Sequence, residues 1–212
     1  MKVNMGTTDK ISEFTVRRLS SYIRILGDLE QRKVRTVSSA KLAELGGITS
    51  AQVRKDLSYF GNFGTRGLGY DVAELKSEIV RILGLNHSWT MALFGAGSLG
   101  HALFFHQGFR EDGFFFTYLF DINPDKIGKK WEDNEILPLD RARELLAQNP
   151  VDIAVIATPK EAAQDIVDLA IESKVKGILN FAPLELTVPK GVSLRNVDLT
   201  VALESLSFSL SL

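Results

Sequence analysis

The chain has 212 residues, of which 45% are hydrophobic and 24% charged, a composition typical of soluble globular proteins. It contains no cysteine and three histidines, which excludes disulfides and thiolate chemistry and leaves little material for a metal centre. No apolar run approaches the roughly 18 to 20 residues of a membrane span, and the start MKVNMGTTDK lacks the apolar segment of an export signal. We therefore expect a cytoplasmic protein without membrane or metal partners.

The net charge of -1 conceals an asymmetry along the chain. The first 70 residues hold 12 lysines and arginines against 6 aspartates and glutamates, whereas the remaining 142 hold 13 against 20. A basic first part on an acidic body indicates that the first part meets a polyanion. The alternative is a solvated basic surface that binds nothing.

Three helices are expected in the first 61 residues. Residues 16–31 carry apolar side chains at three- and four-residue spacing. A shorter helix follows Ser38 or Ser39 and ends at the glycines 46–47, and a third covers residues 51–60 behind Thr49 or Ser50 as its cap. This order and these lengths are typical of a helix-turn-helix unit.

A glycine-rich segment over residues 61–72 follows the third helix and predicts a tight hairpin. Helix-turn-helix followed by such a wing makes a winged helix, whose third helix presents its side chains to the major groove and whose tip reaches the minor groove. The residues expected to contact DNA are Ser50, Gln52, Arg54, Lys55, Ser58 and, on the wing, Arg66. A helix over residues 73–83 then leads to the segment LNHS, the expected domain boundary.

From Trp89 onward, short apolar runs alternate with amphipathic helices. The expected strands are residues 90–94, 114–120, 151–158 and 175–181, and the expected helices are residues 98–107, 140–148 and 161–173. Apolar strands alternating with helices predict an α/β fold with a doubly wound parallel sheet. The domains are expected at 1–85 for the winged helix, 86–197 for the Rossmann-type sheet and 198–212 for a C-terminal helix.

The sequence GAGSLG places Gly95, Gly97 and Gly100 in a G-x-G-x-x-G pattern between a strand and a helix, and Asp121 ends the next strand. These glycines would allow the tight turn, the approach of a pyrophosphate and the packing of helix on strand, while Asp121 would bind the adenosine ribose and favour NAD(H) over NADP(H). A turn without a ligand is the alternative. The expected cofactor-binding residues are Gly95, Ala96, Gly97, Ser98, Leu99, Gly100, Asp121, Thr158, Pro159, Asn180, Ala182 and Pro183.

The nucleotide is expected to act as an effector and not as a reactant. A dehydrogenase needs an acid or base and a substrate domain, but only about 15 residues follow the sheet, and we assign no catalytic residue. Two alternatives stay open: an NAD-dependent oxidoreductase with a helical appendage, and a sensor of another nucleotide such as CoA.

The motifs RKDLSYFGNFGTRGLGYDV, GAGSLG, FDINPDKIG and ILNFAP occur in this order, and with them the sequence resembles the Rex family of bacterial redox-sensing transcriptional repressors over residues 12–212. The resemblance implies a homodimer whose C-terminal helix is swapped onto the partner. It implies that the protein binds inverted-repeat operator DNA when NADH is scarce, and that NADH releases it. NADH and NAD⁺ would be its effector ligands.

The resemblance also implies a network that links the head, the core and the swapped helix. Arg18 and Asp198 match positions of that network. The network often includes a tyrosine six residues after the last loop glycine, where this chain has His106. Because histidine titrates near neutrality, we hypothesise that His106 makes the switch sensitive to pH.

Overall fold

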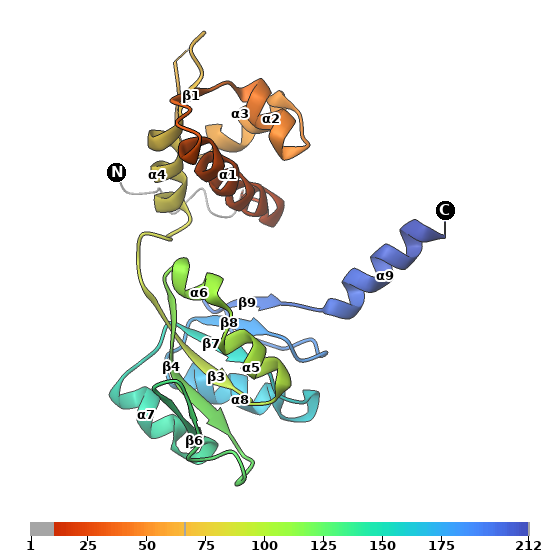
Figure 1. The fold of residues 1–212 in the computed structure, drawn as a ribbon. Coiled ribbons are helices and arrows are strands. Elements are labelled where there is room, and N and C mark those ends of the chain that lie inside the picture. The colour runs from red at the N-terminus through yellow and green to blue at the C-terminus, as the bar shows by residue number, and fades with distance from the viewer. Residues whose placement is uncertain (1–10, 66, 212) are drawn as a thin grey trace. The chain divides into compact units, whose positions relative to one another are not determined.

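The computed structural model describes residues 11–65 and 67–211, so the wing residue Arg66, for which we expect a DNA contact, lies outside the described residues. The chain divides between His87 and Ser88, within the segment LNHS, into two compact units. We call residues 11–87 the head and residues 88–211 the sheet domain, and describe each by itself (Figure 1). No helix among the described residues is long and apolar enough to cross a membrane.

The head contains four helices and one small antiparallel sheet among its described residues. In chain order its elements are α1 (Glu13–Gln31), β1 (Thr36–Val37), α2 (Ser39–Gly46), α3 (Ser50–Ser58), β2 (Tyr70–Asp71) and α4 (Val72–Ile82). Each helix begins behind a side chain that accepts a backbone N–H: Ser12, Ser38, Thr49 and Asp71. Ser38 and Thr49 are thus the caps, where the sequence left Ser39 and Ser50 as alternatives.

The core of the head joins α1 to all the other elements. Apolar side chains at helical spacing on α1 pack against buried side chains of α2, α3 and α4. The fully buried members include Leu19, Tyr22, Leu26, Leu42, Val53, Leu57, Leu75 and Ile79. Between α3 and β2 the chain forms the expected hairpin, closed by an antiparallel bridge from Thr65 to Gly69. A short helix pair with a wing, held by one core, is the winged-helix arrangement.

The sheet domain is built on seven strands in the order β5-β6-β4-β3-β7-β8-β9. Their bounds are β3 (Trp89–Phe94), β4 (Phe114–Asp121), β5 (Lys130–Trp131), β6 (Asn134–Pro138), β7 (Ile153–Ile156), β8 (Gly177–Asn180) and β9 (Ser193–Asn196). All neighbours are parallel except β5, which pairs antiparallel with β6. The expected α/β fold with a doubly wound parallel sheet is confirmed. Strand order reverses at β3, so the carboxyl ends of β3 and β7 mark the topological switch point.

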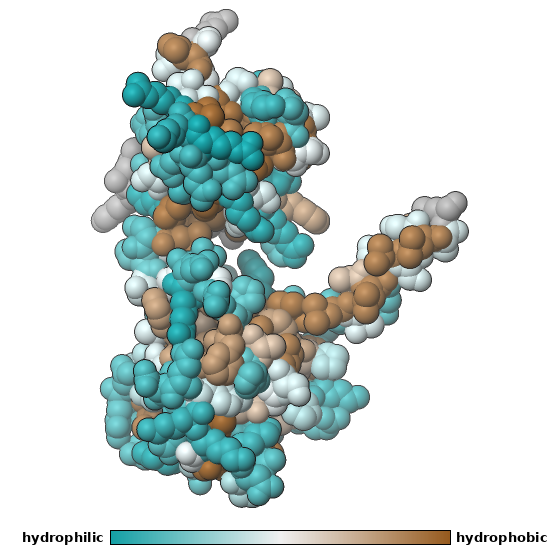
Figure 2. All heavy atoms as spheres, viewed as in Figure 1, coloured by the Kyte–Doolittle hydropathy of each residue, from teal (hydrophilic) through white to brown (hydrophobic). Residues whose placement is uncertain are grey.

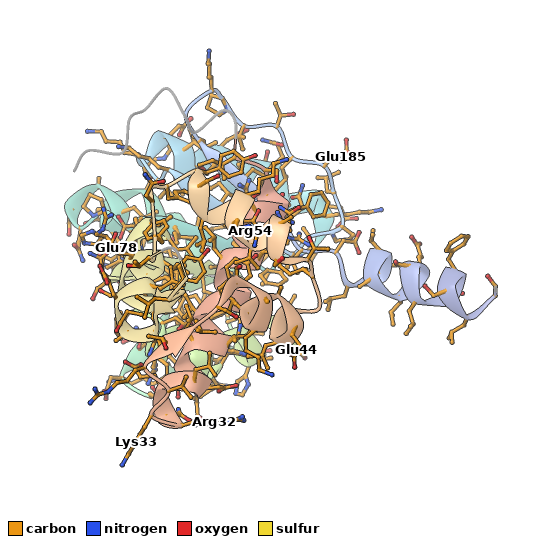
Figure 3. The ribbon with its side chains drawn as sticks, turned by 90° about the horizontal axis from the view of Figure 1, so that it is seen from above. Arg32, Lys33, Glu44, Arg54, Glu78 and Glu185 are labelled. Atoms are coloured by element: carbon orange, nitrogen blue, oxygen red, sulfur yellow. The ribbon has the colours of Figure 1, made fainter. Side chains whose placement is uncertain are left out.

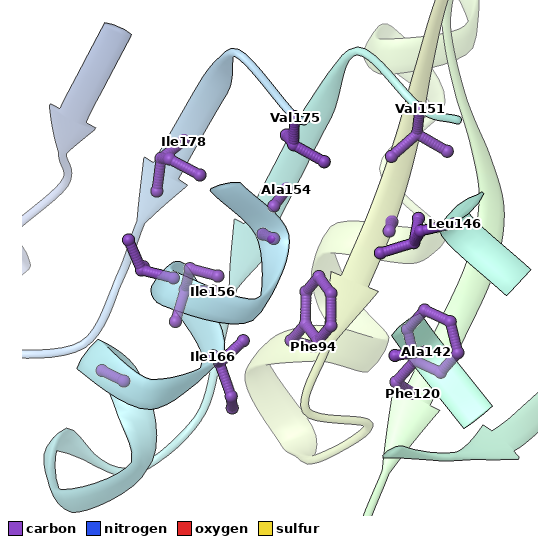
Figure 4. Packing of buried hydrophobic residues seen from close by; sticks show 14 of the residues in the cluster. Phe94, Phe120, Ala142, Leu146, Val151, Ala154, Ile156, Ile166, Val175 and Ile178 are labelled. Atoms are coloured by element: carbon purple, nitrogen blue, oxygen red, sulfur yellow. The ribbon is translucent and has the colours of Figure 1, made fainter. Parts of the chain in front are cut away.

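Helices cover the sheet on both faces because neighbouring strand residues point to opposite sides. Phe94 and Ile156 face α7 (Ala142–Gln148) and α8 (Lys160–Glu172) in the core that Figure 4 shows. Leu93 and Val155 lie in the core on the opposite face, with α5 (Ser98–Phe104) and α6 (Gln107–Glu111). A 3-10 turn, η2 (Leu139–Arg141), precedes α7.

Two expectations for this domain were wrong in detail. The single helix over residues 98–107 is two helices, because α5 ends at Phe104 and His106 starts α6. The short strands β5, β6 and β9 were not expected. They lie toward or at the edges of the sheet. β5 has only two residues and β9 is mostly polar, so neither has the apolar run that marks the buried central strands.

The last helix, α9 (Leu199–Leu210), has no buried residue. Its large apolar side chains are between 56% and 80% exposed. At helical spacing they form two opposite stripes, one of Leu199, Leu203, Leu206 and Leu210 and one of Val201 and Phe208. In Figures 1 and 2 the helix stands off the sheet with apolar surface along its length. Such a helix needs surfaces on two sides to cover it.

Candidate functional site

The loop between β3 and α5 is shaped by its glycines. Gly95 has φ +102, and a Cβ there would lie 2.5 Å from the carbonyl oxygen of Ala157, the residue that follows β7. A Cβ at Gly100 would strike the carbonyl of Gly95, so helix and strand approach closely only because both residues are glycines. A Cβ at Gly97 would meet nothing within 4 Å. The loop is thus closed on the sheet side and open at Gly97.

Asp121, at the end of β4, is tied to this loop. Its Oδ2 accepts the backbone N–H of Ala96 at 2.8 Å, and its Oδ1 accepts that of Asn123 at 2.8 Å. Lys126 Nζ donates to Oδ2 at 3.1 Å. Burial raises the pKa of the Asp121 carboxyl, but these hydrogen bonds outweigh it and hold the pKa below its usual value. Asp121 is therefore an anion at neutral pH, and since a carboxylate has about four acceptor positions, it retains capacity for a ligand.

A cavity of about 330 Å³ opens at the switch point beside the loop. It brings together five of the expected cofactor residues: Gly95, Gly97, Asp121, Thr158 and Pro159. Its other lining residues, which the sequence did not point to, are Phe94, Phe120, Ile122, Lys126, Leu139, Ala157, Ala162 and Ile166. A mostly apolar wall with a carboxylate at one rim suits a planar base joined to a sugar.

Two further features of this region bear on a bound nucleotide. The hydroxyl of Thr158 is buried and has no hydrogen-bond partner among the described residues, so it offers one polar point in the cavity wall. On the other side of the loop, a shallow hollow of about 540 Å³ is lined by Ala96, Gly97, Ser98, His101, Lys126 and Trp131. Lys126 borders both cavities. The sequence feature that could have identified Lys126 is its place in the motif FDINPDKIG.

Of the remaining expected cofactor residues, Ala96 and Ser98 line the shallow hollow, and Asn180, Ala182 and Pro183 follow or end β8. Asn180, fully buried, donates to the carbonyls of Ala182 and Leu184 and to Asn196, and accepts from the N–H of Ala182. It therefore organises the turn after β8. Neither it nor Ala182 and Pro183 line the two cavities around the glycine loop. Their contact with a cofactor stays a prediction, as do those of Ala96, Ser98, Leu99 and Gly100.

The expected DNA-binding residues in the head differ in exposure and in the hydrogen bonds that their side chains make within the protein. Arg54 and Lys55 are exposed on α3, and Figure 3 marks Arg54. Arg54 Nη1 donates to Ser39 Oγ at 2.9 Å, which directs the guanidinium toward α2. Gln52 donates to Asp56 at 2.7 Å and Ser58 to the carbonyl of Lys55 at 2.7 Å. Ser50, half-buried, is the first residue of α3 behind the cap Thr49.

The three residues expected in the linking network each have a local role. Arg18 binds the buried carboxylate of Asp56 within the head. Asp198 is the N-cap of α9, accepting the N–H groups of Thr200 and Val201. His106 starts α6, with its ring centroid 4.8 Å from that of Phe109. Among the described residues no group of three His, Cys, Asp or Glu side chains is placed to hold a metal ion.

Comparison with known proteins decides the family. A redox-sensing transcriptional repressor Rex from Carboxydothermus hydrogenoformans is 52% identical over 95% of this chain and 97% of its own length. The chain belongs to the Rex family. A Rex repressor from Clostridioides difficile is 44% identical over 93% of this chain and 94% of its own length. The Rex relatives are named as regulators, so the chain is a transcriptional regulator and not a dehydrogenase.

Solved structures and family models agree with the Rex assignment. RSP, a Rex-family repressor in complex with NAD⁺ and operator DNA, matches with a TM-score of 0.91 and 38% identity over 94% of this chain and 92% of its own. RSP with NADH matches with a TM-score of 0.86 and 36% identity over 95% and 94%. The family model described as "Putative DNA-binding protein N-terminus" matches residues 10–58, and the one described as "CoA binding domain" matches residues 86–184.

Proposed function

We propose that this Rex-family chain represses transcription as a homodimer, binding inverted-repeat operator DNA when NADH is scarce and leaving it when NADH binds. The observation that carries the proposal is the relative RSP, which shares the fold over 94% of this chain and is solved with NAD⁺ and operator DNA and also with NADH. Since the operator and the nicotinamide pool are intracellular, the protein would act in the cytoplasm.

The residues at the switch point fit NAD(H). The open backbone at Gly97 leaves room for the pyrophosphate, and the apolar wall of the larger cavity suits adenine. The free acceptor positions of Asp121 suit the ribose hydroxyls, and its negative charge opposes the 2′-phosphate of NADP(H). The buried hydroxyl of Thr158 supplies one further hydrogen bond to the ligand.

In the head, α3 would enter the major groove of each half-site with Lys55 foremost, because its side chain is exposed, whereas the side chains of Gln52 and Ser58 donate hydrogen bonds to their own helix. Ser50, near the start of the helix, and Arg54 would bind the flanking phosphates, and Arg66 the minor groove. A two-fold dimer then requires an inverted repeat whose half-sites are separated by whole helical turns.

The homodimer would form through α9. Its two apolar stripes need two covering surfaces, and the described part of its own chain covers neither. An apolar cavity of about 350 Å³, at the amino ends of the strands on the α6 face, offers a seat on the partner's sheet domain. Its apolar lining comprises Met91, Phe109, Phe114, Ile153, Ile178 and Leu179. Swapping the helix would bury leucines that stand in water in the isolated chain.

NADH works as a switch only if it binds one dimer arrangement more tightly than the other. His106 and Asp198 would transmit that preference, together with Arg18. Because Arg18 already holds Asp56 with two hydrogen bonds, its part would be to fix the position of α1 against α3.

The test is a mobility-shift assay on an inverted-repeat operator selected by the protein from random duplexes, titrated with NADH, NAD⁺, NADPH and CoA. We expect NADH to release the DNA at the lowest concentration. Release by CoA alone would favour the CoA-sensor alternative, for which the family-model match over residues 86–184 is the supporting observation. Failure to bind any duplex in any nucleotide state would overturn the proposal.

A further inference from the structure

The tip of the wing carries a leucine that is not packed in the core of the head. The side chain of Leu68 is 70% exposed, which is among the highest values for a large apolar residue in the head. It lies between two glycines, Gly67 and Gly69, which have no side chains to cover it. Isolated exposed leucines are common, but this one stands on a projecting element.

The wing holds Leu68 in this position. The N–H groups of Leu68 and Gly69 both donate to the carbonyl of Thr65, at 3.0 and 3.1 Å, and the N–H of Thr65 donates to Gly69 at 2.9 Å. Gly69 has φ +88, and a Cβ there would lie 2.5 Å from the carbonyl oxygen of Val37. The wing therefore lies close against β1 at Gly69, and the turn holds the backbone of Leu68 at the tip.

Leu68 also forms one wall of a hollow between the wing and the two helices of the helix-turn-helix unit. This hollow, which we call the wing cradle, has a volume of about 410 Å³ and is lined by Ser38, Ser39, Arg54, Phe63, Gly64, Thr65, Gly67, Leu68, Gly69 and Tyr70. Arg54, directed by its hydrogen bond to Ser39, supplies a cation to it. The cradle thus combines a charged side with an apolar rim.

The occupant that fits this combination is one strand of a DNA duplex. Between a helix in the major groove and a wing in the adjacent minor groove lies a single sugar-phosphate strand, anionic at its phosphates and apolar at its sugars. The minor groove is only about 6 Å wide, and a leucine flanked on both sides by glycines can approach its floor closely. Apolar side chains are known to enter minor grooves and contact base steps there.

We propose that Leu68 is an apolar minor-groove contact of the operator complex, and that the strand between the two grooves lies in the wing cradle with a phosphate on Arg54. The inference rests on the DNA binding proposed above and adds Leu68 as a determinant of affinity that carries no charge. Within the wing cradle, Leu68 would then contribute to operator affinity by apolar contact and Arg54 by its charge.

The salt dependence of operator affinity separates these contributions. The probe is the duplex selected by the wild-type protein, and the dissociation constant is measured from about 50 to 200 mM KCl. Leu68→Ser should weaken binding about tenfold at every salt concentration with the slope unchanged, because no counterion is involved. Arg54→Gln should weaken binding and reduce the slope by about one. Leu68→Ile, which stays apolar, should keep most of the affinity.

A base substitution tests the groove. Replacing adenine by 2,6-diaminopurine adds an amino group to the minor groove and leaves the major-groove edge as it is. At one or more base steps of the operator, this replacement should weaken binding by the wild-type protein more than binding by the Leu68→Ser variant. Absence of any such step would overturn the inference.

Further outcomes keep the inference distinct from the proposed function. It fails if wild-type protein binds the operator and Leu68→Ser binds equally well, or if Leu68→Ser changes the salt slope as Arg54→Gln does. It also fails if Leu68→Ser dissociates the dimer in sedimentation, since Leu68 would then contact a second copy. Hydrogen exchange of the α1 and α3 amides in each variant checks that the head is folded. If the wild-type protein binds no duplex at all, the proposed function fails.

Discussion

Arg18 on α1 binds the carboxylate of Asp56 on α3 through two hydrogen bonds, donated by Nε at 2.6 Å and by Nη2 at 2.7 Å. Asp56 is fully buried, and it also accepts the hydroxyl of Tyr22 at 2.8 Å and the amide of Gln52 at 2.7 Å. The helix proposed to enter the major groove is thus fixed to α1 by the ion pair with Arg18 and the hydrogen bond from Tyr22, while Gln52 binds the same carboxylate from within α3.

Removing the arginine should destabilise the head strongly, since it leaves a buried carboxylate without its counter-charge. We expect Arg18→Ala to lower the free energy of unfolding of the head by about 3 kcal/mol. Hydrogen exchange of the α1 and α3 amides in the full chain measures this. The control is Arg17→Ala, whose partner Glu13 and own side chain are exposed, and which should leave exchange nearly unchanged. Equal effects of the two variants would contradict the assignment.

The same cluster predicts a pH window for the head. Burial raises the pKa of Asp56, but the bonds from Arg18, Tyr22 and Gln52 outweigh it and set the pKa below its usual value. Stability from this group is therefore present at neutral pH and lost as pH falls below about 4. Burial, and then the hydrogen bond to Asp56, raise the pKa of Tyr22, so its contribution is lost as pH rises above about 10.

Urea unfolding followed by circular dichroism at several pH values tests both sides of this window. Asp56→Asn should lower stability at neutral pH and flatten the acid side. Tyr22→Phe should flatten the alkaline side only. An unchanged pH profile in either variant would show that another group sets that limit.

Asp121 shapes the glycine loop through its hydrogen bonds and places a negative charge at the proposed ribose site, and one substitution separates these two roles. Asp121→Asn keeps the size of the side chain but removes the negative charge beside the ribose, so NADH affinity should fall about tenfold while the NADPH to NADH affinity ratio rises. Fluorescence titration with both nucleotides measures the ratio. Asp125→Asn, an exposed position in the same loop, is the matched control and should change neither affinity. A fall in NADH affinity without a change in the ratio would assign Asp121 to loop shape alone.

The apolar stripe of α9 predicts the assembly state. Leu203→Glu together with Leu206→Glu places two charges on the leucine stripe, so the dimer should dissociate to monomers in sedimentation experiments. Ser207→Glu adds a charge to the same helix away from both stripes and should leave the dimer intact. A stable dimer with the leucine substitutions would exclude α9 as the interface.

His106 predicts an effect of one substitution on the switch. His106→Tyr restores the residue often found in the family at this place, so the NADH concentration that releases operator DNA should change. The ring of His106 packs on Phe109, and a tyrosine ring would keep that aromatic neighbour. An equal release concentration for both proteins would remove His106 from the network.

The sequence predicted local features well where a single segment carries the signal. The sequence narrowed two helix caps to neighbouring pairs, Ser38 or Ser39 and Thr49 or Ser50, and placed the end of the second helix at the glycines 46–47, because these features depend on chemistry within four residues. It missed the break between α5 and α6, because residues 98–107 run on without a proline or internal stop. It also missed β9, whose edge position needs no continuous apolar run.

By itself the sequence determined the glycine loop, the acidic end of β4 and the two-part order of head and sheet, because each depends on residue type at short spacing. Only the tertiary structure decided that Ile122, Leu139 and Ile166 share one cavity with Gly97, since parallel crossovers bring distant segments to one sheet edge. It likewise decided that Asp56, 38 residues from Arg18, is a buried anchor and not a surface charge. Contacts between side chains far apart in the chain are set by packing, which no local pattern encodes.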